Sequence, residues 1–198
     1  MSELNKTSHT LIQRAIDLDD KEAWDQLYAF YHKFIYYLLN QMSISSAQMD
    51  DVVQDVMISL MKNLKSYDRT KGRFRSWLKT IIRNSALMEV RKQASQNRRI
   101  DGLEAEESVM GVGRESEFDS LIDREWKKYV SGIALERIRN SFRGQAVEVF
   151  ELSLTGMSTE EISAKTGLKH DSIYSLRRRV KRSMVLEVQN IVADLEQL

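Results

Sequence analysis

The sequence contains no cysteine and no proline among its 198 residues, and only eight glycines. The absence of cysteine excludes a disulfide framework and a thiolate metal site, and it fits a reducing compartment. Because proline interrupts helices and marks loops, its absence favours long helices joined by short turns. No apolar run approaches the ~20 residues of a membrane span, and the N-terminal residues lack a signal-peptide pattern. We therefore expect a soluble, cytoplasmic, all-α protein.

A formal net charge of +1 conceals a strong segregation of charge along the chain. Residues 62–99 contain twelve lysines and arginines against two acidic residues, and residues 169–182 contain six against one. Between them, residues 101–125 contain nine acidic residues against two arginines. Two basic blocks separated by an acidic block predict two anion-binding surfaces on different structural units.

The spacing of apolar residues predicts how the chain is divided. Apolar residues recur at helical spacing over residues 11–18, 23–39, 52–64 and 72–93. Residues 94–118 lack such a period, are mostly polar and contain three glycines, which is typical of a flexible linker. We therefore predict two small helical domains, residues 1–93 and 119–198, with the second containing a helix-turn-helix.

The helix expected over residues 72–93 combines an apolar stripe with a basic edge. The residues expected to face a core are Phe74, Trp77, Leu78, Ile81, Ile82 and Met88. Phe74 could instead shape a surface pocket, because it lies near the start of the helix. The basic edge consists of Arg75, Lys79 and Arg83 at i, i+4 and i+8, with Asn84 and Arg91 close in angle. Taken alone, such an edge is either a binding surface or a solvated helix face.

Residues 158–184 contain the parts of a helix-turn-helix. Ser158 and Glu161 have the spacing of a capping box, and Gly167 suits the left-handed position that ends a helix. A second helix is expected to begin near His170, with an apolar side made of Ile173, Leu176, Val180 and Met184.

The outward side of this second helix has the residue types that read duplex DNA. It would present Tyr174, Ser175, Arg178, Arg179 and Arg182, with His170 at its start. Arginine can read guanine in the major groove, while serine and tyrosine can hold phosphates. We therefore predict DNA binding here; the alternative is a basic helix that only caps a bundle.

Residues 50–92 resemble conserved region 2 of bacterial RNA polymerase sigma factors. Residues 51–57 read DVVQDVM where the family has approximately DLVQEVF. The family's second signature is matched by Phe74, Trp77, Leu78, Arg83, Asn84, Glu89 and Lys92, with glutamate at 89 in place of the usual aspartate. Residues 147–184 resemble region 4. With these two regions and no region 1 or 3, the chain resembles the extracytoplasmic-function (ECF) type.

The resemblance implies a role for each candidate residue. The polymerase contacts, on the clamp of the largest subunit, would be Asp51, Gln54 and Asp55. The pocket for a base of the −10 element would be built by Tyr67, Asp68, Arg69 and Lys71. The basic edge of residues 75–91 would hold the opened strand. The second domain would recognise the −35 element and meet the polymerase flap, and an anti-sigma factor would be a further partner.

Two other classes of protein are alternatives to a sigma factor. A helix-turn-helix repressor or activator would bind duplex DNA tightly without core polymerase. An enzyme would need a catalytic set, and the only candidate is the cluster Asp50, Asp51 and Asp55, which has no second carboxylate set at matching spacing. We therefore expect no catalytic activity, no metal and no cofactor.

Overall fold

The computed structural model describes residues 11–16, 20–42, 44–101 and 115–196. The elements in chain order are α1 (Leu11–Ile16), α2 (Lys21–Asn40), α3 (Ser46–Asn63), the 3-10 turns η1 (Leu64–Ser66) and η2 (Arg69–Lys71), α4 (Phe74–Asp101), α5 (Glu115–Ser141), α6 (Ala146–Leu154), α7 (Thr159–Thr166) and α8 (His170–Glu196). Regular structure in this described part is helical throughout, which confirms the predicted all-α class. None of its helices has both the length and the apolar character that a membrane span requires.

The chain divides into two compact units. The first comprises Met1–Lys127 with Leu195–Leu198, and the second comprises Lys128–Asp194. The boundary therefore falls inside α5 and differs from the predicted limits, a linker over residues 94–118 and a second domain from residue 119. The physical reason is burial: Phe118 and Trp126 are 0% and 3% exposed in the first unit, so the start of α5 is core there.

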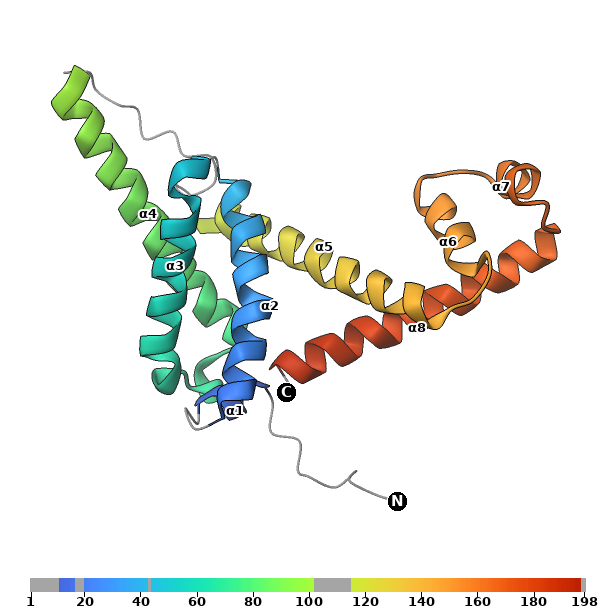
Figure 1. Cartoon of the computed structure of the whole chain (residues 1–198), viewed down its shortest axis with the longest axis horizontal. Coiled ribbons are helices and arrows are strands. Elements are labelled where there is room, and N and C mark those ends of the chain that lie inside the picture. Colours follow the sequence, from blue (N-terminus) through green and yellow to red (C-terminus); the bar gives the residue numbers. More distant parts are fainter. Residues whose placement is uncertain (1–10, 17–19, 43, 102–114, 197–198) are drawn as a thin grey trace. The chain divides into compact units, whose positions relative to one another are not determined.

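The core of the first unit is made by apolar stripes on its helices. Helix α3 packs against both α2 and α4 (Figure 1). The stripe of α2 recurs every three or four residues, the period that keeps side chains on one face of a helix. The fully buried large side chains are Leu27, Tyr31, Phe34, Ile35, Leu38, Leu39, Met42, Met49, Leu60, Leu64, Phe74 and Phe118. This packing fixes the loop between α3 and α4, where the first candidate site lies.

The start of α2 is fixed by a side-chain cap. Asp20 accepts a hydrogen bond from the Ala23 amide at 2.9 Å, and it also accepts one from Arg14 Nε at 2.8 Å. The hydrogen bond from Arg14, followed by that from the Ala23 amide, holds the pKa of Asp20 below its usual value. The cap satisfies an amide that the helix itself leaves unpaired, and the ion pair ties α1 to α2.

The second unit contains the helix-turn-helix that the sequence predicts. The Glu161 amide donates to Ser158 Oγ at 3.2 Å, and the Ser158 amide donates to Glu161 Oε2 at 2.7 Å, which confirms the capping box. Gly167 ends α7 with φ of 72°. A Cβ at Gly167 would meet no atom within 4 Å, so glycine is favoured there by the backbone conformation alone.

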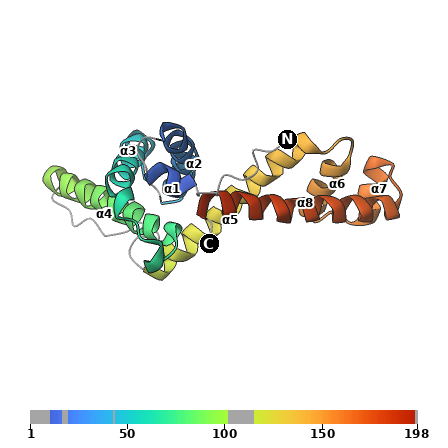
Figure 2. The same cartoon turned by 90° about the horizontal axis from the view of Figure 1, so that it is seen from below.

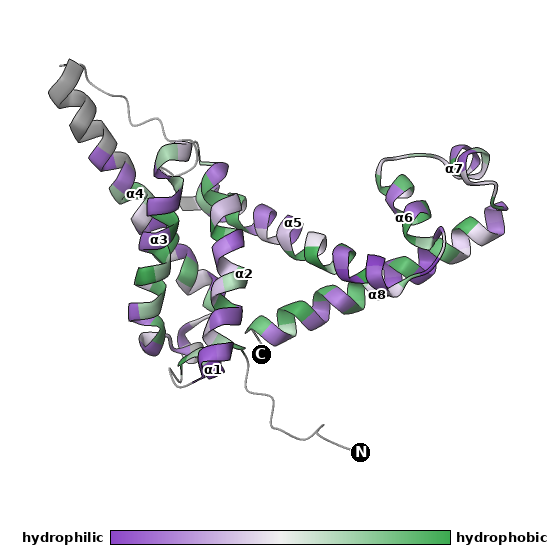
Figure 3. Cartoon of the chain, in the orientation of Figure 1, coloured by the Kyte–Doolittle hydropathy of each residue, from purple (hydrophilic) through white to green (hydrophobic). Residues whose placement is uncertain are grey.

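The two helices of this motif and α6 share one small core. Val149, Ile162 and Ile173, one from each helix, are all fully buried and pack together. In both views α6 and α7 lie beside the first half of α8 (Figure 2). Hydrophobic and hydrophilic residues alternate along α8 (Figure 3), so one side of it joins the core and the other is left for solvent.

Candidate nucleic-acid interface

The loop between α3 and α4 is held by its own hydrogen bonds. Tyr67 Oη donates to the Gly72 carbonyl at 3.0 Å, closing the loop from one end to the other. Asp68 accepts from the Thr70 hydroxyl at 2.7 Å and from the Thr70 amide at 2.9 Å, and Lys71 Nζ lies 3.7 Å away. The Thr70 hydroxyl, then its amide, hold the pKa of Asp68 below its usual value.

An aromatic cluster joins this loop to the start of α4. The ring of Tyr67 lies 5.2 Å from that of Phe74 and 5.5 Å from that of Trp77, measured between centroids. Phe74 is 1% exposed and also contacts Tyr31 of α2 at 5.3 Å. The structure thus makes Phe74 a core residue, as the apolar stripe indicates, and it makes Tyr67 and Trp77 the half-buried aromatic residues at the surface.

The basic edge of α4 begins at the second residue of the helix, directly after the loop. Arg75, Lys79 and Arg83 are all half-buried, whereas Asn84 and Arg91 are exposed. In the loop, Tyr67 and Asp68 are half-buried and Lys71 is exposed. The side chain of Arg69, at the start of η2, lies outside the described side chains.

One residue expected in the core of α4 is exposed. Met88 is 70% exposed, which corrects the prediction that it continues the apolar stripe. The buried positions in this part of the helix are Leu78, Ile82, Ala86 and Glu89, at spacings of four, four and three. Because 3.6 residues complete a turn, these four positions share one face of the helix, and Met88 lies off that face. Glu89 retains a partner, Lys92, at 3.3 Å.

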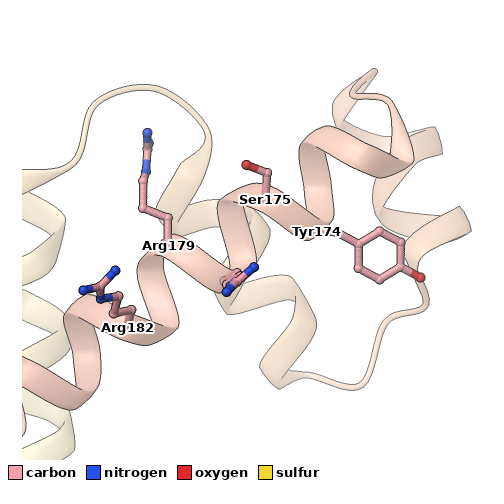
Figure 4. A pocket seen from close by; sticks show the side chains of 5 residues that line it. Tyr174, Ser175, Arg179 and Arg182 are labelled. Carbon is pink, nitrogen blue, oxygen red and sulfur yellow. The ribbon is translucent and has the colours of Figure 1, made fainter.

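The outward side of α8 forms an open basic surface. A shallow hollow of about 430 Å³ is lined by Tyr174, Ser175, Arg178, Arg179 and Arg182 (Figure 4). All five side chains are exposed, and His170 is exposed at the start of the same helix. The opposite side carries Ile173 and Val180, both fully buried. The structure therefore places these predicted residues on one face.

One arginine of this surface is oriented by an aromatic ring. The guanidinium carbon of Arg179 lies 5.2 Å from the ring centroid of Phe142, and Ser175 projects on the same side of α8 (Figure 4). A cation over a ring face is attracted by the ring's quadrupole, which restricts the rotamers of the arginine. Spacing within α8 could not indicate this contact, because Phe142 lies in the turn before α6.

A third predicted surface lies on α3. Asp51, Gln54 and Asp55 are exposed, on the side of the helix opposite the buried valines. Ile58 and Met61 follow on the exposed side and are 37% and 45% exposed. Met61 belongs to the apolar period predicted over residues 52–64, yet it is exposed and adds a hydrophobic end to an otherwise acidic surface.

The three surfaces define an all-helical protein with two basic faces and one acidic face, carried on two units. The family model for sigma-70 region 2 matches residues 27–96, from within α2 through the loop and into α4. The first unit of the chain therefore contains a sigma-70 region 2 domain. This match confirms the resemblance to region 2 that the motifs of residues 50–92 predict.

Among solved structures, CnrH in complex with the cytosolic domain of CnrY is similar to this chain, with 19% identity and a TM-score of 0.36. The alignment covers 91% of this chain and 96% of that one. A search of curated proteins gave no match.

Proposed function

We propose that the protein is an ECF-type sigma factor that carries regions 2 and 4 only. In this proposal it joins core RNA polymerase in the cytoplasm, recognises promoter DNA and opens the −10 element, with no catalytic activity of its own. The observation that carries the proposal is the open, arginine-lined face of α8 in a chain whose other unit contains a region 2 domain.

The acidic face of α3 is the proposed contact with polymerase. Asp51, Gln54 and Asp55 are free to meet a basic surface on the clamp of the largest subunit, because all three are exposed. Ile58 and Met61 would add apolar contact at the end of the same face. An interface of this composition combines steering by charge with burial of apolar area.

The loop and the edge of α4 are the proposed site of promoter opening. A base taken out of the stack needs a pocket with aromatic walls and polar groups that read its edge. Tyr67 and Trp77 supply half-buried rings, and Asp68 and Lys71 supply charged groups on a loop that is already ordered. The exposed Asn84 and Arg91 would follow the displaced strand along α4.

The second domain, predicted over residues 119–198, is proposed to recognise the −35 element with α8 and to meet the polymerase flap. Support comes from the five outward residues of α8, because arginines at this spacing reach base edges and phosphates of one groove. An anti-sigma factor that covers the acidic face of α3 and the basic faces is the proposed inhibitory partner.

In vitro transcription tests this proposal directly. Core polymerase with the full-length protein is expected to start transcripts from a defined subset of a random promoter library, and neither component alone should do so. Footprinting of the protein without polymerase provides the control. Tight protection of an operator by the protein alone, with no polymerase-dependent start, would instead identify a repressor or activator.

A further inference from the structure

The basic edge of α4 is covered by an acidic edge of α5 within the first unit. Lys79 Nζ lies 2.6 Å from a carboxylate oxygen of Asp119, and Arg75 Nε lies 4.0 Å from one of Asp123. The side chains of Arg75 and Lys79 are only 22% and 23% exposed. These are two of the basic residues proposed to hold opened DNA.

The two ion pairs share one helical register. Four residues separate Arg75 from Lys79 on α4, and four residues separate Asp119 from Asp123 on α5, with the order of pairing reversed. This is the pattern of two antiparallel helices whose edges meet over one turn. Arg75 gains a further contact, because its guanidinium carbon lies 5.2 Å from the ring centroid of Trp126. The acidic edge is therefore matched to the basic one in both charge and spacing.

Apolar residues anchor this part of α5. Phe118, Ile122 and Trp126 are 0%, 2% and 3% exposed, and the Trp126 ring lies 5.1 Å from that of Phe34 between centroids. Exposing a Phe and a Trp, about 150–250 Å² each, would be far less favourable than breaking two half-exposed ion pairs. The helix is therefore expected to stay in place while the charged side chains exchange partners.

The interface also leaves polar atoms without hydrogen bonds. Asp119 Oδ1 and, one turn beyond Lys79, Arg83 Nε are buried and have no hydrogen-bond partner among the described residues. A charged side chain whose buried atom has no hydrogen-bond partner loses hydration at that atom without replacement. The covered state thus does not satisfy this edge completely, and a ligand with more acceptor oxygens could.

We propose that Asp119 and Asp123 act as an internal competitor for DNA. They occupy Lys79 and Arg75 in the free protein, and phosphates of the opened strand replace them, since carboxylate and phosphate oxygens accept the same charge-assisted hydrogen bonds. This inference rests on the proposed role of the α4 edge in holding the opened strand. It makes the first unit a weak DNA binder until the promoter presents its phosphates at this edge.

The test measures single-stranded DNA binding by the full chain at low salt. A fluorescein-labelled oligonucleotide is titrated by anisotropy with D119N/D123N and with the parent protein, both carrying R178A and R182A to suppress binding by α8. The matched control is E136Q/E148Q, which removes the same number of negative charges from exposed residues of the second unit. Circular dichroism melting verifies that each variant is folded. The expected result is about five- to tenfold tighter binding by D119N/D123N and little change in the control.

A third variant separates this inference from the function on which it rests. Lys79→Gln should weaken binding both in the parent and in D119N/D123N. If Lys79→Gln weakens binding but D119N/D123N binds no tighter than the parent, the competitor is disproved while the role of the edge stands. If Lys79→Gln has no effect in either background, or if no variant binds, the α4 edge does not hold DNA and both are overturned.

Discussion

Both basic surfaces of this protein are helix faces that carry arginine or lysine, but the environments of their side chains differ. On α4, Arg75 and Lys79 lie half-buried against Asp123 and Asp119 of α5. On α8, the predicted arginines line an open hollow, and the one whose contact is defined, Arg179, stacks on an aromatic ring instead of pairing with an acid. A cation already paired with a carboxylate must exchange one partner for another to bind DNA, whereas a solvated cation only releases water and counterions. For the proposed binding of DNA, the α8 surface is therefore already open, whereas Arg75 and Lys79 on α4 would first have to exchange their carboxylate partners.

The largest expected effect comes from removing the anchor that holds α5 against the first unit. Trp126→Ala should lower the free energy of unfolding by about 3–5 kcal/mol, because it empties a buried site among three aromatic rings. Urea denaturation followed by circular dichroism measures it, with the exposed Leu154→Ala as control. A loss no larger than that of the control would show that the start of α5 is not part of the first unit.

The next largest effect is expected from an arginine of the open α8 surface. Arg178→Ala should weaken binding to −35 promoter DNA by about 1–3 kcal/mol, the usual contribution of a base-reading arginine. Transcription from promoter variants with core polymerase measures it, and the exposed Arg143→Ala, which removes the same charge outside α8, is the control. Equal losses of transcription in the two variants would show that Arg178 contributes only its charge and reads no base.

A smaller effect is expected from the N-cap of α7, the helix that packs against the start of α8. Ser158→Ala removes the acceptor for the Glu161 amide and should lower stability by about 1 kcal/mol, the typical value for a lost N-cap. Thermal unfolding gives the change, and hydrogen exchange of the α7 amides shows whether it is local. Ser158→Asp keeps an acceptor at this position and should restore most of the loss; failure to do so would argue against the cap as the cause.

The smallest effect is the response of the loop before α4 to acid. The pKa of Asp68 is lowered by hydrogen bonds from Thr70, so the contribution of this turn is complete above the ordinary aspartate value of about 3.9 and is lost as pH falls through the lower folded value. The amide shift of Thr70 in NMR spectra should follow this titration. Its persistence in Asp68→Asn would assign the titration to another group.

The sequence predicted best where structure is set by neighbours along the chain. The capping box of Ser158 and Glu161, the left-handed Gly167 and the start of α8 at His170 are all as predicted, because each depends on contacts within a few residues. The outward face of α8 was predictable for the same reason. Its buried positions repeat at helical spacing, and the remaining side is necessarily exposed.

The prediction was weakest at the end of α4 and the start of α5. The polar residues from 94 onwards were interpreted as linker, yet α4 continues to Asp101 and α5 begins at Glu115. Phe118, Ile122 and Trp126 have helical spacing and could have indicated a buried face, but the acidic residues between them obscured it. Met88 was also misplaced, because it lies off the helix face that Leu78, Ile82 and Ala86 share.

By itself the sequence determined that the chain is helical, that it contains a region 2 segment and a helix-turn-helix, and that two of its surfaces are basic. Only the tertiary structure decided which basic surface is covered. Helical periodicity establishes that Arg75 and Lys79 share one edge and that Asp119 and Asp123 share another. Which edges meet depends on where buried side chains such as Trp126 pack, and that packing involves residues far apart in the chain.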